Sequence, residues 1–97
     1  MSALQTQEKV LGTESIEVST TLNRLGLAER DEEKFAEAEM IMKRALSIRE
    51  KLLASNDMWI AVSLENLASV YLVEGQREKA IPLLARAQTI RSHASSD

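Results

Sequence analysis

Apolar residues recur at helical spacing between residues 34 and 54. Steps of three and four residues connect most members of this series, which are Ala38, Ile41, Met42, Ala45, Ile48 and Leu52. Charged residues fill the intervening positions: Glu37, Lys43, Arg44, Glu50 and Lys51. This pattern places the apolar side chains on one face of an α-helix over about 34–54.

A second apolar segment, residues 58–74, is hydrophobic on more than one side. Ile60, Leu64, Leu67 and Tyr71 share one face, and Ala61, Ala68 and Val70 widen it. The Ser-Asn-Asp stretch at 55–57 offers side-chain oxygens that can cap the first amides of such a helix. A helix that is apolar all round is usually covered on several sides, so we expect neighbours on both flanks.

The chain matches itself when it is shifted by 42 residues. Matching pairs run along its length: Ala3 and Ala45, Leu4 and Leu46, Leu22 and Leu64, Leu25 and Leu67, Ala38 and Ala80, Ala45 and Ala87, and Ile48-Arg49 with Ile90-Arg91. A fixed period of this size indicates stacked helical repeats. The fold class is therefore all-α.

The period predicts five helices over about 2–11, 15–30, 34–54, 58–74 and 77–92, with a turn at 31–33 and another at Gly75. They form one domain over 1–97, in which residues 1–12 are the end of the second helix of a partial preceding repeat. Repeat 1 spans 15–54, repeat 2 spans 58–92, and residues 93–97 are expected to be a flexible tail. Stacks usually need about three repeats, so the chain is expected to belong to a longer array or to self-associate.

Residues 61–87 resemble a tetratricopeptide repeat. The positions that carry the resemblance are Leu64, Leu67, Ala68, Tyr71, Gly75, Ala80, Leu84 and Ala87. The 42-residue period is similar to the longer variety of this repeat found in kinesin light chains. The resemblance implies antiparallel helix pairs stacked as a right-handed α-solenoid. The first repeat departs from the family pattern, because Glu29 stands where Tyr is usual and Glu33 where Gly is usual.

Small residues predict where paired helices cross closely. Only Gly or Ala allows two helix backbones to approach, so Gly26 is expected to face Ala38, and Ala68 to face Ala80.

Composition removes several classes of function. The formal net charge of -3 argues against a nucleic-acid footprint, and the absence of cysteine is consistent with a reducing cytosol. No signal peptide and no apolar run of roughly 18 residues is present, which favours a cytoplasmic protein without a membrane partner. The single histidine, His93, cannot form a catalytic triad or a cluster of metal ligands. The acidic residues within 29–33 are interpreted as a solvated turn. We therefore expect no enzyme activity, no cofactor and no metal.

The resemblance implies a protein interaction scaffold that binds a peptide or partner segment in a concave groove. The first helix of each pair lines this groove, which places there Thr20, Asn23, Arg24, Leu27 and Arg30 of repeat 1 with Val62, Glu65, Asn66, Ser69 and Leu72 of repeat 2. In the family, an Asn at the position of Asn66 often hydrogen-bonds a peptide backbone, since an amide both donates and accepts. Arg24 occupies the equivalent position and could pair with a carboxylate. The alternative is that both are solvated residues of a surface without a ligand.

Trp59 and the stack ends offer other interaction surfaces. Trp59 stands at the position of Glu17, where exposure is expected and where an indole could be a binding hot spot. Alternatively, it folds over the junction between the repeats.

A structural role is the second hypothesis for the whole chain. Its apolar stack ends would pair with another copy and form a homo-oligomer, which polar substitution of Leu83 or Leu84 would dissociate.

Overall fold

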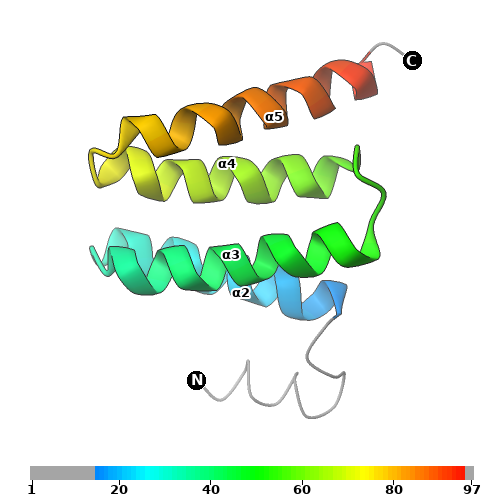
Figure 1. Ribbon diagram of the computed structural model, residues 1–97. Coiled ribbons are helices and arrows are strands. Elements are labelled where there is room, and N and C mark those ends of the chain that lie inside the picture. Colours follow the sequence, from blue (N-terminus) through cyan, green and yellow to red (C-terminus); the bar gives the residue numbers. More distant parts are fainter. Residues whose placement is uncertain (1–14, 96–97) are drawn as a thin grey trace.

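The computed structural model describes residues 15–95, which form four α-helices in antiparallel order (Figure 1). They are α2 (Ile16–Asp31), α3 (Phe35–Leu52), α4 (Met58–Val73) and α5 (Arg77–Ser95). No strand occurs in this part of the chain, so the all-α prediction is confirmed. The helix expected over 2–11 lies outside the described residues.

The predicted helix boundaries agree with the structure to within one residue except at two C-terminal ends. α3 ends at Leu52 rather than at residue 54. α5 continues to Ser95, so the expected end at residue 92 is wrong, and the tail expected over 93–97 is helical over 93–95. The polar composition of this segment suggested a tail, but polar residues remain helical when they extend an established helix that needs no new nucleation.

Side-chain caps begin two of the helices. Ser15 precedes α2 in an extended conformation, and its hydroxyl oxygen accepts a hydrogen bond from the amide of Val18 at 3.1 Å. Asp57 precedes α4, and its carboxylate accepts from the amide of Trp59 at 2.8 Å. Each cap satisfies an amide that has no partner within its helix, which explains why α4 begins directly after the Ser-Asn-Asp stretch.

The turns that end α2 and α4 have the same geometry. In repeat 2, Gly75 donates to the Leu72 carbonyl at 3.1 Å and Gln76 donates to the Tyr71 carbonyl at 2.7 Å. These two bonds form a Schellman motif, whose turn residue is left-handed. Gly75 has φ 81°, and Glu33, the equivalent residue of repeat 1, has φ 62°. Repeat 1 therefore holds a side chain in a conformation that favours glycine.

We expect Glu33→Gly to raise the free energy of unfolding by about 1 kcal/mol, because it removes the left-handed penalty of a residue with a Cβ. Gly75→Ala is expected to lower it by about 1 kcal/mol. No atom lies within 4 Å of a Cβ built on Gly75, so this cost is conformational and not steric. Urea unfolding of the two variants measures both effects, and a destabilised Glu33→Gly variant would contradict the argument.

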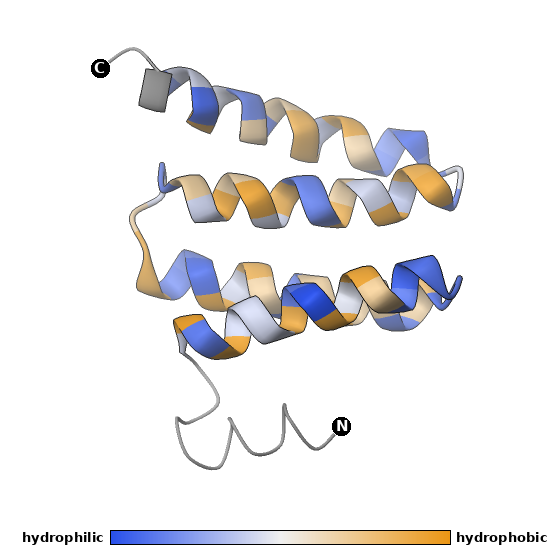
Figure 2. Cartoon of the chain, turned by 180° about the vertical axis from the view of Figure 1, so that it is seen from behind, coloured by the Kyte–Doolittle hydropathy of each residue, from blue (hydrophilic) through white to orange (hydrophobic). Residues whose placement is uncertain are grey.

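The helices pack as two pairs, α2 with α3 and α4 with α5, and α4 lies between α3 and α5 (Figure 1). α4 carries hydrophobic residues along its length, as its intermediate place requires (Figure 2). Its buried hydrophobic residues belong to two core clusters. One joins it to Ala38, Met42 and Ala80, and the other to Ala87 and Ile90. The prediction that this helix is covered on both flanks is confirmed.

Small residues lie in the core of the described helices. Ala68 and Ala80 belong to the same cluster and are fully buried. Gly26 is also buried, and the atoms nearest to a Cβ built on it belong to Met42, with Cγ at 2.6 Å; the expected pairing of Gly26 with Ala38 stays a prediction. The long side chain of Met42 reaches back over the preceding turn of α3, so it occupies the space opposite the glycine.

Candidate functional site

A buried arginine connects three helices at the junction of the two repeats. Arg49 of α3 is only 2% exposed and donates from Nε to the Ser19 hydroxyl of α2 at 3.0 Å. Its Nη1 donates to the Trp59 carbonyl at 3.0 Å and to the Ser63 hydroxyl at 2.9 Å, both on α4. We call this set the Arg49 junction: Arg49, Ser19, Thr20, Asn23, Trp59 and Ser63.

The amide of Asn23 completes the Arg49 junction. With its oxygen turned toward the guanidinium, it accepts from Arg49 Nη1 at 2.8 Å. The Thr20 hydroxyl accepts a longer hydrogen bond from Nη2 at 3.4 Å. Every one of these partners is uncharged, and burial lowers the pKa of Arg49, with the nearby Asp57 charge acting in the opposite direction. The junction therefore depends on hydrogen-bond geometry rather than on an ion pair.

Repeat 2 contains the equivalent arginine in a different setting. Arg91 lies 42 residues after Arg49 and forms a two-pronged ion pair with Glu65, the equivalent of Asn23, at 2.6 and 2.5 Å. Both side chains are 37% exposed. The hydrogen bonds from Arg91 lower the pKa of the Glu65 carboxyl. The same position thus forms a buried junction inside the stack and a solvated ion pair at its end.

Most residues predicted to line the groove have partners within the chain. Asn23 and Thr20 belong to the Arg49 junction, and Glu65 is held by Arg91. Arg30 donates to the Ser69 hydroxyl at 2.9 Å and also pairs with Asp31. Leu27 packs against the core. These side chains connect α2 to α4 or support the core.

Arg24 and Asn66 differ from the other predicted groove residues. They occupy equivalent positions in the two repeats, Arg24 exposed on α2 and Asn66 half-buried on α4. Neither side chain has a hydrogen-bond or ion-pair partner among residues 15–95. Near them on α4, Leu72 is 48% exposed, and Val62 is half-buried. We call the surface of these four residues the α2–α4 face.

Trp59 combines the two roles that the sequence left open. It is 56% exposed, and the guanidinium carbon of Arg49 lies 5.3 Å from the ring centroid. One side of the indole therefore covers the buried arginine, in a cation–π contact, while much of the ring remains accessible to solvent.

We expect iodide to quench the fluorescence of Trp59, the only tryptophan, to a degree between that of the unfolded chain and that of a buried indole. The neighbouring Arg49 attracts the anion, so Arg49→Met is expected to reduce iodide quenching more than quenching by neutral acrylamide. Complete shielding from both quenchers would exclude Trp59 as a contact for a partner.

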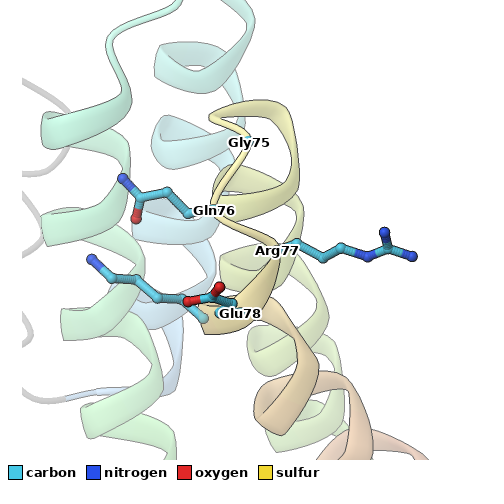
Figure 3. A pocket seen from close by; sticks show the side chains of 5 residues that line it. Gly75, Gln76, Arg77 and Glu78 are labelled. Carbon is cyan, nitrogen blue, oxygen red and sulfur yellow. The ribbon is translucent and has the colours of Figure 1, made fainter.

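Two hollows on the surface of the described residues are open and do not form an enclosed ligand site. One follows the α4–α5 turn and is lined by five successive residues, 75–79 (Figure 3). Within it, the Arg77 side chain points away from Gln76. A second hollow lies where α2 turns into α3 and is lined by Arg30, Asp31, Glu33, Phe35 and Val73. Within residues 15–95, no three His or acidic side chains are grouped to hold a metal ion.

The exposed apolar residues of α5 mark one end of the described stack. Ile81 is 57% exposed and Leu84 is 38% exposed. Leu83, by contrast, packs against both clusters that contain α4. A polar residue at position 83 would therefore disturb the core, so of these two leucines only Leu84 is suited to probing association through this end.

None of the described helices has the length and hydrophobicity needed to cross a bilayer.

Stacked antiparallel helix pairs with a repeated turn and a repeated junction position define an α-helical repeat protein. A family model for the tetratricopeptide repeat matches residues 2–51 and 17–93, and the chain belongs to this family. It is 41% identical over 76 residues to a TPR repeat-containing protein of Dictyostelium discoideum, covering 78% of this chain and 5% of that protein. Repeats of this family generally mediate protein–protein interactions and are generally non-catalytic.

The fold resembles the crystal structure of BtubC (BKLC) from P. vanneervenii with a TM-score of 0.86 and 28% sequence identity. The match covers 98% of this chain and 38% of that chain. BtubC is a kinesin light chain-like protein, so the similarity to the 42-residue variety of the repeat is confirmed. The chain spans only a small part of the curated relative and well under half of the solved structure.

Proposed function

We propose that this chain is a protein interaction module that binds an extended peptide segment along the α2–α4 face. The observation that carries the proposal is the pair Arg24 and Asn66, which lie at equivalent positions of adjacent repeats and have no partner among the described residues. The neighbouring polar side chains of the groove are already used to connect the helices. Arg24 and Asn66 are therefore the polar groups that remain available to a ligand.

The chemistry of these two residues suits an extended segment with an acidic group. Asn66 can donate to a peptide carbonyl and accept from a peptide amide at the same time. Arg24 can form a two-pronged hydrogen bond to a carboxylate. Leu72 adds an apolar contact near the end of α4. The Arg30–Ser69 and Asn23–Ser63 hydrogen bonds join α2 to α4, so the two polar groups are held at a fixed separation before a ligand binds.

A random peptide display library, screened against the full chain, tests the proposal. Peptides selected by the unmodified chain are expected to lose about 10- to 100-fold in affinity for the Arg24→Ala, Asn66→Ala double variant. Circular dichroism should show unchanged helix content, because neither side chain supports the fold. The matched control is Arg77→Ala with Asn56→Ala, which removes the same types of group from exposed positions outside the α2–α4 face. Binding that survives the first pair and is lost in the control pair would refute the proposal.

A further inference from the structure

One face of α5 is not covered by any described helix. α5 packs chiefly against α4, and Arg86 also pairs with Glu50 of α3 at 2.6 Å, whereas another side of α5 carries residues spaced along a single helical face. We call them the α5 end face: Ile81, Leu84, Ala85, Gln88 and Arg91. The three residues at 81, 84 and 85 are apolar and exposed, whereas the two at the C-terminal end of the face are polar.

The first repeat shows what covers the same face inside the stack. The residues of α3 that lie 42 positions earlier are in contact with α4: Met42 and Leu46 pack on clusters that contain α4 residues, and Arg49 donates to Trp59 and Ser63. This contact, together with contacts to α2, buries Met42 and Arg49. Met42 is fully buried and its equivalent, Leu84, is 38% exposed. An antiparallel helix in the register of α4 would cover the α5 end face in the same way (Figure 1).

The α5 end face is not a copy of the α3 face, and the differences describe its partner. Ile81 replaces Glu39 and Ala85 replaces Lys43, so the N-terminal part is more apolar than its counterpart. Gln88 replaces Leu46, which touches both clusters around α4. A helix with leucine opposite position 88 would therefore bury an amide without a hydrogen bond, whereas a polar side chain there would satisfy it.

We propose that the α5 end face binds an amphipathic helix that runs antiparallel to α5, as α4 runs antiparallel to α3. Its contact stripe carries aliphatic or aromatic side chains over Ile81 and Leu84 and a polar side chain opposite Gln88. At its N-terminal end, a hydroxyl and a backbone carbonyl take the places that Ser63 and Trp59 occupy beside Arg49. This surface is separate from the α2–α4 face, so the proposal does not depend on peptide binding there.

A second copy of α5 fits this face less well than such a helix. In an antiparallel two-fold pairing centred between Leu84 and Ala85, Ile81 of one copy meets Gln88 of the other. Each apolar half then covers a polar half, which leaves the amide without a hydrogen bond and adds little apolar contact. The asymmetry along α5 thus favours a helix of different sequence.

The experiment extends the full chain by one repeat in register. Residues 1–95 are followed directly by a second copy of residues 54–97, which places a copy of α4 against α5. The new helix buries Ile81 and Leu84. The thermal midpoint of the extended chain is therefore expected to exceed that of the parent chain by about 5 °C or more. Gln88→Leu is expected to raise the midpoint further in the extended chain, since the appended α4 carries leucines suited to Leu46.

Leu84→Glu separates docking on the α5 end face from a mere increase in length. In the extended chain this substitution is expected to lower the midpoint by about 10 °C or more, and in the parent chain by about 5 °C. An equal effect in both chains, or no gain from the added repeat, would overturn the proposal. Light scattering of the parent chain gives the remaining test: a dimer that Leu84→Glu dissociates would assign the face to a second copy instead.

Discussion

Arg49→Met is expected to lower the free energy of unfolding by about 2 to 3 kcal/mol. Methionine fills the volume of the arginine stem, but it cannot donate to Ser19, Ser63 or the Trp59 carbonyl. The buried oxygen of Asn23 also loses both hydrogen bonds from the guanidinium and keeps only the longer one from the Ser63 hydroxyl. Relief of the cost of burying a charge offsets part of this loss. Urea unfolding followed by far-UV circular dichroism measures the difference.

Three variants show whether the hydrogen bonds cause the loss. Arg49→Lys keeps the charge without the planar fork and is expected to be intermediate. Arg91→Met removes the equivalent arginine from a solvated ion pair, so its effect should be several-fold smaller than that of Arg49→Met. Adding Asn23→Leu and Ser63→Ala to Arg49→Met removes the orphaned polar groups and is expected to recover part of the stability. Equal losses for Arg49→Met and Arg91→Met would contradict the structure.

Met42→Ala is expected to cost about 3 kcal/mol, because it removes a fully buried side chain that packs in the core cluster with α4 and against Gly26 of α2. The equivalent change in repeat 2, Leu84→Ala, is expected to cost about 1 kcal/mol, since more than a third of that side chain is already exposed. The two positions have similar chemistry and the same place in their repeats, so the difference reports the presence of a following helix.

Equilibrium unfolding of the two variants under identical conditions checks this difference. The denaturant slope must stay unchanged for the comparison to hold, because a change in slope signals a change in the exposed surface. A cost at position 84 that matches the cost at position 42 would show that Leu84 is covered in solution. Such a result would mean that the α5 end face is already covered in the unmodified, unextended chain.

The helices could be predicted because their signals are local. Apolar spacing indicated α3 and α4, Asp57 marked the start of α4, and Gly75 marked the turn before α5. The 42-residue match then extended the assignment to α2, where the left-handed turn falls on Glu33 rather than on a glycine. The end of α5 could not be predicted in this way, since no capping residue marks it.

The Arg49 junction could not be predicted from the pattern of polar and apolar residues. An arginine near the end of an amphipathic helix is usually exposed, and the hydroxyls of Ser19 and Ser63 lie on other helices. One signal was present: Arg49 follows Met42 by seven residues and Ala45 by four, which places it on the buried face of α3. The repetition of Ile48-Arg49 at Ile90-Arg91 pointed to the same position.

The sequence by itself determined that the chain is a stack of helical repeats, because spacing, caps and period act within one or two turns of a helix. Only the tertiary structure decided which polar residues are used internally and which remain available. Asn23 and Arg24 are neighbours in sequence, yet one is buried beside Arg49 and the other is exposed. Successive residues of a helix point about 100° apart, so the placement of α3 and α4 around α2 separates a structural residue from a candidate binding residue.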